Sequence, residues 1–529
     1  MQHRPWARDG HYALFPFQSV ELIAMKTYES YRGLPMFAGV GSLEEVSRSQ
    51  LSVEGCVARL KRHHYAFKRL HQIFLARLTA EPIYELKMAY SLHAYQCSEH
   101  VAALRLRVSE MRDPPLGLDI IPHTALRLFF DEILAAPTTE ELLLGIYEQA
   151  LPALKAALER HLADTNRLTD HPSVRLCRFA LLELDDMLAF GAQAIAKLVT
   201  PEQRAQFNPW LALLDDCLAA AGSLHGAAPR APGVPPGQAS ITPDVTPISS
   251  NTSPESTPTR QDAGGTLVPH HSATPYTYDP VPKRDARFPD PYNMGVNAEV
   301  FLYDEKMPAK AKTLMMFYKR LREIDVPEMM ASIITQTHGK PWAYTRDMTR
   351  QLWDEARHAM MGEVGFVQAG VDWHKVMVNF TWALALNTQL KPLERHAVLY
   401  YIEQGLMPKM GKRFEWDTAL ASGDPLAAVI QDFDWADEVL HARVGRDWYL
   451  KEFADPKEAV RYGDECWSKV LMGWRQWRDE GLTQHRNWWP DVYRDACRAW
   501  GVEPDPQVLA YNTSYETVRA DLKELTGSA

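Results

Sequence analysis

The chain has 529 residues, 46% of them hydrophobic, and a formal net charge of −10 at pH 7. This length exceeds what one hydrophobic core usually supports, so we expect at least two domains. The negative charge argues against a nucleic-acid surface and against an anionic membrane, because neither attracts an acidic protein. The N-terminus lacks the apolar run of a signal peptide, and no apolar stretch reaches the roughly eighteen residues that span a bilayer. The six cysteines are scattered without a Cys-x-x-Cys pair, so we expect a cytoplasmic protein.

The first predicted domain covers residues 1–225. Its apolar residues recur at three- and four-residue spacing, which is typical of amphipathic helices, and prolines stand at the edges of these stretches. The adjacent histidines His63 and His64 lack the carboxylate spacing of a metal motif, and we assign them no role. The predicted helices are 56–79, 82–112, 139–163, 172–198 and 202–221.

A compositional break follows at residues 226–285. This segment is rich in Pro, Ser, Thr and Gly. Such a composition cannot bury enough apolar surface to offset the entropy lost on ordering. We therefore predict a disordered linker between two domains.

The second predicted domain covers residues 286–529 and is again helical, with tryptophans crowded near its C-terminal end. The fold class predicted on both sides of the linker is thus all-α. The predicted helices are 308–337, 342–370, 373–389, 392–416, 425–452 and 456–480.

One pattern, Asp-Glu-x-x-His-Ala-x-x-Gly, occurs twice in the second domain, at residues 354–362 and 437–445. Residues three apart share one face of a helix. Glu355 with His358, and Glu438 with His441, therefore each aim a carboxylate and an imidazole at one point. One Glu-x-x-His is common in helical proteins, but two copies with matching flanks favour a pair of metal ions held between facing helices.

Such a centre needs one further carboxylate from the helix that precedes each motif. Glu323 stands 32 residues before Glu355, and Glu403 stands 35 residues before Glu438. Both offsets fit antiparallel helices of four to five turns joined by short loops. Glu328 is an alternative to Glu323, because it shares a face with apolar neighbours, and Glu363 and Glu394 are weaker alternatives.

The residues beside the motifs extend the pattern. A metal-bound histidine usually gives its second ring N–H to a carboxylate or a carbonyl. Asp354 and Asp437 are placed to hold the histidine of the opposite helix. Gly362 and Gly445, four residues beyond each histidine, leave room where a larger side chain would crowd a neighbouring helix.

On these motifs, residues from about 300 to 455 resemble the ferritin-like superfamily of di-iron carboxylate proteins. The resemblance implies a bundle that binds two iron ions, with manganese or a mixed iron–manganese pair as alternatives. It also implies a non-haem oxidoreductase that uses O2 to oxidise or hydroxylate a small organic substrate. The alternatives are a ferroxidase or peroxide-handling protein and a metal-binding scaffold without catalysis. An electron-donor protein and a second copy of the chain remain open as partners. The implied metal ligands are Glu323, Glu355, His358, Glu403, Glu438 and His441.

The first domain resembles the same fold with an eroded site. Glu148 lies 35 residues before Glu183, but Asp186 stands where the histidine belongs. In the preceding hairpin His100 follows Cys97 by three residues, with Tyr65 in place of the upstream acid. We therefore expect two tandem ferritin-like bundles, the first without its metal centre. A residual metal site that uses His100, Glu148, Glu183 and Asp186 is the alternative.

Overall fold

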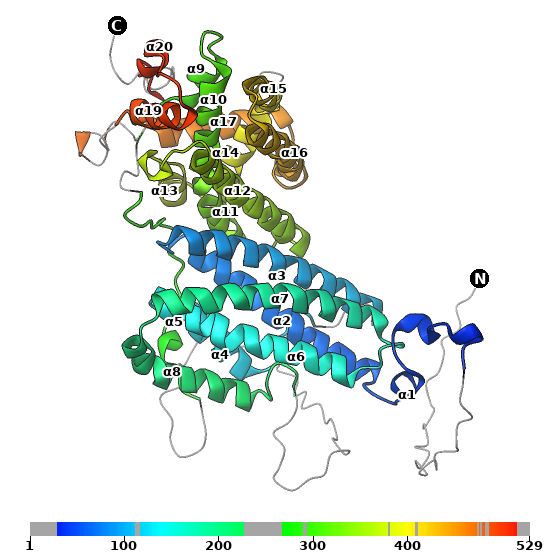
Figure 1. Ribbon diagram of the computed structural model, residues 1–529. Coiled ribbons are helices and arrows are strands. Elements are labelled where there is room, and N and C mark those ends of the chain that lie inside the picture. Colours follow the sequence, from blue (N-terminus) through cyan, green and yellow to red (C-terminus); the bar gives the residue numbers. More distant parts are fainter. Residues whose placement is uncertain are drawn as a thin grey trace, which may run out of the picture.

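Every regular element is a helix in the part of the chain that the computed structural model describes (Figure 1). This confirms the all-α prediction. No helix in that part combines the length and the apolarity needed to cross a membrane. The described residues are 29–111, 117–226, 267–288, 293, 295–378, 381–407, 411–472, 476, 479–481 and 486–515.

The first bundle is built from long helices whose ends follow their capping residues. The hydroxyl of Ser52 accepts from the backbone N–H of Gly55 at the start of α2, and Thr200 and Gln203 form a capping box at the start of α8. Helix α4 was not predicted from the sequence. The elements are η1 (Tyr31–Gly33), η2 (Met36–Gly39), α1 (Leu43–Val46), α2 (Val53–Leu78), α3 (Tyr84–Met111), α4 (Thr124–Leu134), α5 (Thr139–Leu143), the π-helix η3 (Leu144–Ala150), α6 (Leu151–Asp164), α7 (His171–Leu198) and α8 (Pro201–Ala220).

The second bundle contains more and shorter helices than predicted. The expected helix 392–416 is interrupted, because α14 ends at Gly405 and α15 begins at Lys412. The elements are α9 (Ala298–Tyr303), α10 (Ala309–Leu321), η5 (Arg322–Ile324), α11 (Asp325–Gln336), α12 (Trp342–Gln368), η6 (Trp373–Lys375), α13 (Thr381–Gln389), α14 (Pro392–Gly405), α15 (Lys412–Ser422), α16 (Pro425–Trp448), η7 (Leu450–Glu452), α17 (Pro456–Met472), α19 (Trp489–Trp500) and α20 (Pro506–Leu509).

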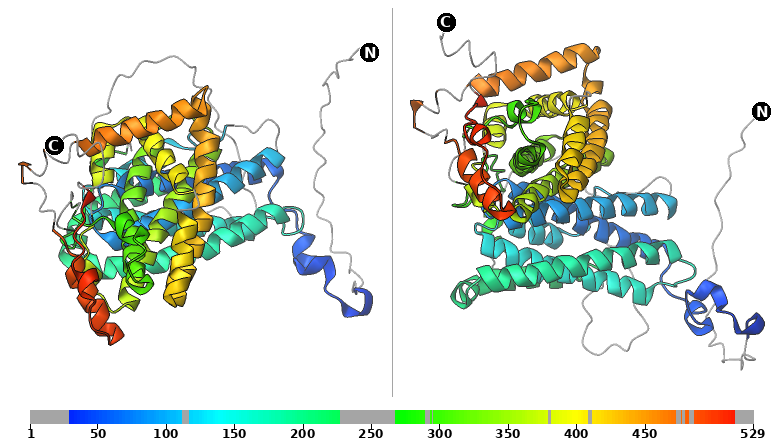
Figure 2. Two further views of the ribbon diagram at one scale, coloured as in Figure 1. Left: turned by 90° about the horizontal axis from the view of Figure 1, so that it is seen from above. Right: turned by 45° about the horizontal axis from the view of Figure 1, so that its top comes forward.

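Helix α12 is central to the second bundle. It packs against α10, α11 and α16, while α14 packs against α16 and α17. Figure 2 shows α17, in orange, along one edge of this bundle. The arrangement places the middle of α12 between the helices that carry the other predicted ligands.

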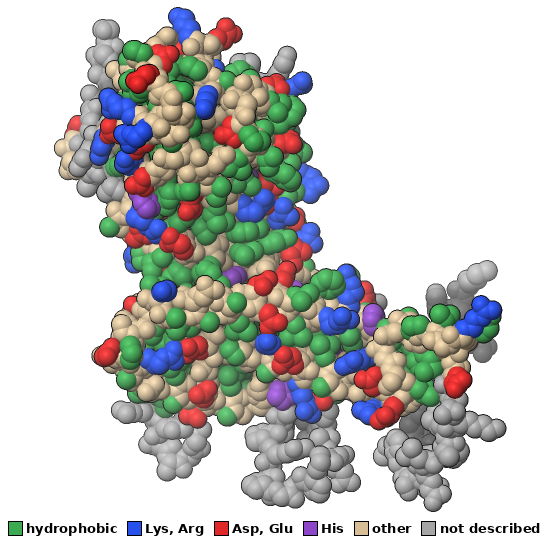
Figure 3. Space-filling model, in the orientation of Figure 1, with side chains coloured by type: hydrophobic (Ala, Val, Ile, Leu, Met, Phe, Trp, Pro, Cys, Tyr) green, Lys and Arg blue, Asp and Glu red, His purple; other side chains and the backbone are tan. Residues whose placement is uncertain are grey.

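The two bundles pack directly on each other. Helix α12 lies on α3 and α11 lies on α2, as Figure 1 shows at the junction of the two parts. Apolar side chains of both bundles, including Leu75 and Leu78 on one side and Met330 and Leu352 on the other, belong to one continuous buried cluster. On the face shown in Figure 3, charged side chains of both signs are interspersed over both bundles.

Part of the predicted linker is packed against the protein. Residues 227–266 lie outside the described part, but residues 267–288 contact the first bundle and, through Arg284, the second. The Glu132 carboxylate of α4 accepts hydrogen bonds from the backbone N–H groups of His270, His271 and Ser272 at 2.8–2.9 Å. The Tyr276 hydroxyl donates to the backbone carbonyl of Ala76 at 3.1 Å. The prediction of disorder was therefore wrong for residues 267–285, because anchoring side chains outweigh the average composition of the segment.

Candidate metal centre

The two Glu-x-x-His pairs lie on facing helices. Glu355 and His358 come from α12, Glu438 and His441 come from α16, and these helices pack together. At most 3% of any of these four side chains is exposed. The imidazole ring centroids lie 5.9 Å apart. The three-residue spacing thus turns both pairs towards one buried point.

Glu355 lies between the two histidines. Its Oε1 is 3.2 Å from Nδ1 of His441, and its Oε2 is 3.5 Å from Nδ1 of His358. Nδ1 of His441 also lies 3.5 Å from Oε2 of Glu438. One carboxylate therefore faces both imidazoles, which is the placement of a ligand that bridges two ions.

The upstream glutamates join the same cluster. Oε2 of Glu323, in the turn η5, lies 3.3 Å from Nδ1 of His358, and Oε1 of Glu403, on α14, lies 3.8 Å from Nδ1 of His441. The ligand atoms form two groups, and within each group all atoms lie within 4.8 Å of one another. Glu438 belongs to both groups. One group is Glu355, Glu403, Glu438 and His441, and the other is Glu323, His358 and Glu438.

The donor atoms of this cluster are suited to cations because many of them have no other partner. Buried polar groups in folded proteins are nearly always hydrogen-bonded, so unpartnered atoms indicate a missing ligand. All six predicted ligands converge here; their binding of metal stays a prediction. Buried atoms without a hydrogen-bond partner include Nδ1 of His358 and His441 and Oε2 of Glu323, Glu403 and Glu438.

The aspartates of the motifs hold the outer sides of the histidines, each across the helix interface. Oδ2 of Asp437 on α16 lies 3.2 Å from Nε2 of His358, and Oδ2 of Asp354 on α12 lies 3.5 Å from Nε2 of His441. Arg357 donates to both aspartates, at 2.8 Å to Asp437. A carboxylate at Nε2 keeps the proton on that nitrogen and leaves Nδ1 free to face the cluster.

Three charged residues of the centre were not predicted from the sequence. Asp434 stands one turn before Glu438 on α16 and is fully buried. Nζ of Lys412 lies 2.9 Å from both Asp434 and Glu438, and Arg320 pairs with Asp434 and, at 2.9 Å, with Glu323. The four-residue spacing of Asp434 from Glu438 was a signal that could have been used. Lys412 and Arg320 carry no such signal.

Gln351 is a further residue that the motifs did not indicate. It stands one turn before Glu355 on α12, and its Nε2 donates to Oε1 of Glu403 at 3.0 Å. The same oxygen of Glu403 lies near His441. Gln351 therefore orients the carboxylate that α14 contributes.

The centre holds more buried carboxylates than buried cations. Glu323, Glu355, Glu403, Glu438 and Asp434 outnumber the cations Arg320 and Lys412 by three when all are ionised.

Without bound cations, protons balance this excess. Burial raises the pKa of Glu403 well above its usual value, and repulsion by Glu438 adds to the effect. Burial opposes a charge on His358, but the carboxylates of Asp437, Glu323 and Glu355 beside its ring raise its pKa to about 10. The pKa of His441 is raised in the same way, by Asp354 and by glutamates, against the effect of burial. The raised pKa values of Glu403, His358 and His441 favour their protonated forms at pH 7.

Glu328, the alternative to Glu323, lies elsewhere, and that alternative was wrong. Its carboxylate is buried at the junction of the bundles, where Lys87 of α3 donates to it at 2.5 Å and Arg284 at 2.7 Å. The turn η5 separates the faces of α10 and α11, so Glu323 points to the centre and Glu328 points to the first bundle. The weaker alternatives also lie elsewhere, because Glu394 accepts from the N–H of Lys391 and Glu363 faces Tyr84.

The residual site considered for the first bundle does not form. Nε2 of His100 lies 2.6 Å from Glu183, but Glu148 pairs with Arg204 and Asp186 is exposed. Glu148 lies in the π-helix η3, whose wider turn changes the face that each residue presents. The 35-residue offset from Glu148 to Glu183 therefore does not bring the two carboxylates together.

Comparisons with known proteins return no relative: no family model matches the chain, and neither a curated protein nor a solved structure matches it.

Proposed function

We propose that the chain is a ferritin-like, non-haem di-iron oxidoreductase, or its iron–manganese counterpart, that uses O2 to oxidise or hydroxylate a small organic substrate. The observation that carries the proposal is the placement of Glu355, whose two oxygens face Nδ1 of His358 and Nδ1 of His441. A carboxylate in this position can hold two ions at once. The proposal thus rests on a paired centre and not on one isolated cation.

The set of donors favours iron or manganese. Carboxylate oxygens are hard ligands and imidazoles are intermediate, and the centre offers no sulfur. Carboxylate bundles with two metals take a Glu-x-x-His from each of two helices and a single glutamate from each of two others. Here α12 and α16 carry the pairs, while η5 and α14 carry the single glutamates.

The surrounding residues would prepare this centre for redox chemistry. Asp354 and Asp437 fix the histidines with Nδ1 inward, so little reorganisation is needed when a cation enters. Lys412 and Arg320 offset part of the negative charge. Five of the six ligands are buried and the Glu323 side chain is 16% exposed, which limits the access of bulk water. Iron ions bound there would supply the electrons that reduction of O2 requires.

The test is the iron content and O2 consumption of the full chain. Protein loaded with Fe(II) under anaerobic conditions and then desalted is expected to hold two irons per chain, and to consume O2 with a reductant faster than free Fe(II) does. Glu355→Gln is expected to lose both ions, because its carboxylate serves both halves of the centre. Glu394→Gln, on α14 but outside the centre, is the matched control and is expected to behave like wild type.

Two results would overturn the proposal. The first is a wild-type protein that holds fewer than two irons, or an iron-loaded protein that does not consume O2. The second is a Glu355→Gln variant that keeps both irons. A tightly held zinc pair without redox activity would favour the metal-binding scaffold instead.

A further inference from the structure

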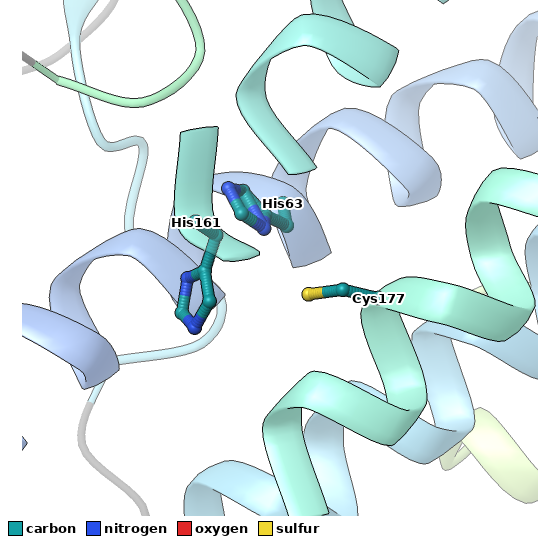
Figure 4. Close-up of side chains that lie close together, drawn as sticks. All are labelled: His63, His161 and Cys177. Atoms are coloured by element: carbon teal, nitrogen blue, oxygen red, sulfur yellow. The ribbon is translucent and has the colours of Figure 1, made fainter. Parts of the chain in front are cut away.

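A second cluster of metal-ligating side chains lies in the first bundle. Figure 4 shows His63 from α2, His161 from α6 and Cys177 from α7, with the thiol of Cys177 directed towards the two imidazoles. One ligand atom of each lies within 4.8 Å of the others. The imidazole centroids are 5.5 Å apart, and the three residues are at most 1% exposed.

Three of the four ring nitrogens of this cluster lack hydrogen-bond partners. These are Nδ1 and Nε2 of His63 and Nδ1 of His161. A neutral imidazole carries one donor and one acceptor, and burying both without partners is unfavourable. A histidine that only packs in the core has no reason to lie beside a second histidine and a thiol. The unpartnered nitrogens therefore indicate a ligand in the bundle.

The surroundings of His161 resemble the support that metal-bound histidines receive. Oδ2 of Asp170 lies 3.5 Å from Nε2 of His161, and this carboxylate accepts from Thr165 at 3.0 Å and from Arg107 at 2.9 Å. A carboxylate on one ring nitrogen orients the other nitrogen towards a cation. Cys56, two turns before His63 on α2, places a further thiol beside His161.

We propose that His63, His161 and Cys177 bind one zinc(II) ion, which ties α2, α6 and α7 together. Imidazole nitrogen and thiolate sulfur are the ligands that zinc prefers in structural sites. The carboxylate centre of the second bundle contains no sulfur, so the two sites would select different metals. Zinc bound there would link three helices of one bundle, because its three ligands are buried and come from α2, α6 and α7.

The decisive measurement is the zinc X-ray absorption spectrum of the full chain. A sulfur neighbour at about 2.3 Å is expected, together with nitrogen neighbours at about 2.0 Å. Cobalt(II) offers a second readout, because only a thiolate ligand gives an intense charge-transfer band in the near ultraviolet. Both signals are expected in wild type and in Glu355→Gln, which distinguishes this site from the carboxylate centre.

Variants test the assignment of residues. Cys177→Ala is expected to lose the sulfur signal and the rise in thermal midpoint that zinc gives to wild type. Cys217→Ala is the matched control, because Cys217 is an equally buried free cysteine of the same bundle, on α8. His63→Gln is expected to weaken zinc binding at least tenfold. His93→Gln, whose native ring bonds to Tyr147, is expected not to weaken it.

The proposal is overturned if the wild-type spectrum shows no sulfur neighbour, a result that needs no variant. It is also overturned if the signal survives in Cys177→Ala, or if Cys217→Ala loses it equally.

Discussion

Gly362 offers a sharp test of how helix packing positions the candidate metal centre. It lies on α12, one turn beyond His358, where the helix crosses α10. A Cβ at this position would lie 2.3 Å from the backbone nitrogen of Leu321 and 2.5 Å from the carbonyl oxygen of Phe317. Ordinary contacts of a Cβ begin at 3.4 Å, so Gly362→Ala would increase the separation of α10 and α12 by about 1 Å. Because the obstacle is backbone, no side-chain rotation can relieve it.

The expected cost follows from two opposed effects. Overpacking of a tight interface costs about 1–3 kcal/mol. Replacing glycine by alanine within a helix returns about 1 kcal/mol of helix propensity. The contact is with backbone, which places the clash at the upper end, so we expect a net loss of about 2 kcal/mol in the free energy of unfolding.

The same shift should also disturb metal binding. Glu323 follows Leu321 by two residues, so moving the end of α10 displaces one ligand of the centre. We expect affinity for Fe(II) or Mn(II) to fall by about tenfold or more, as when a ligand loses its support. Glu403, on α14, should keep its place.

The measurements are urea unfolding followed by circular dichroism and calorimetric titration with Mn(II). Gly405→Ala is the control, because the Cβ that alanine adds at this exposed helical position would meet nothing within 4 Å, and the change should be neutral or slightly stabilising. If Gly362→Ala unfolds at the wild-type urea concentration and binds Mn(II) with wild-type affinity, close packing of α10 on α12 does not position the centre.

Three further predictions concern the support of the centre, its protons and the anchor of residues 267–288. Asp437→Asn should lower metal affinity by about 10- to 100-fold, because His358 loses the carboxylate at its Nε2. The helix content of the variant should stay that of wild type. An unchanged metal affinity in calorimetry would contradict the prediction. Metal loading at pH 7 should release up to about three protons, because cations bind the deprotonated ligands and the pKa of His358 is raised to about 10. Metal affinity should therefore rise with pH. Calorimetric titration in buffers of different ionisation enthalpy counts the released protons, and a pH-independent affinity would refute the charge balance. Glu132→Ala should cost on the order of 3 kcal/mol of unfolding free energy, because residues 270–272 lose their acceptor. Burial alone would raise the pKa of Glu132, but hydrogen bonds from Ser272 and its neighbours outweigh burial and lower it. The stabilisation that Glu132 gives is therefore present above pH 4.5 and is lost as the pH falls through the lowered pKa. In acid unfolding, the stabilities of wild type and Glu132→Ala should then converge.

The sequence alone determined the helical class and the Glu-x-x-His pairs on α12 and α16. Residues three apart on a helix share a face whatever surrounds them, so Glu355 with His358 and Glu438 with His441 could be paired without coordinates. The repetition of the pattern indicated that the two helices face each other. The crossing of Asp354 and Asp437 to the opposite histidines followed from the same spacing.

Spacing between helices was a weaker guide, because it depends on how each intervening turn rotates the chain. The offset before Glu355 admitted both Glu323 and Glu328, and only the turn η5 separated them. The identical 35-residue offset succeeded for Glu403 and failed for Glu148, which a π-helix turns to solvent. Disorder was predicted from average composition, which overlooked the anchoring contacts of residues 267–288.

Only the tertiary structure could bring together residues with no common helix or local pattern. Lys412 and Arg320 reach the centre from α15 and α10, and the cluster of His63, His161 and Cys177 joins α2 to the distant helices α6 and α7. Local geometry fixes which side chains share a face of one helix. Which faces then meet is decided by the packing of whole helices around a common core, and no spacing along the chain encodes it.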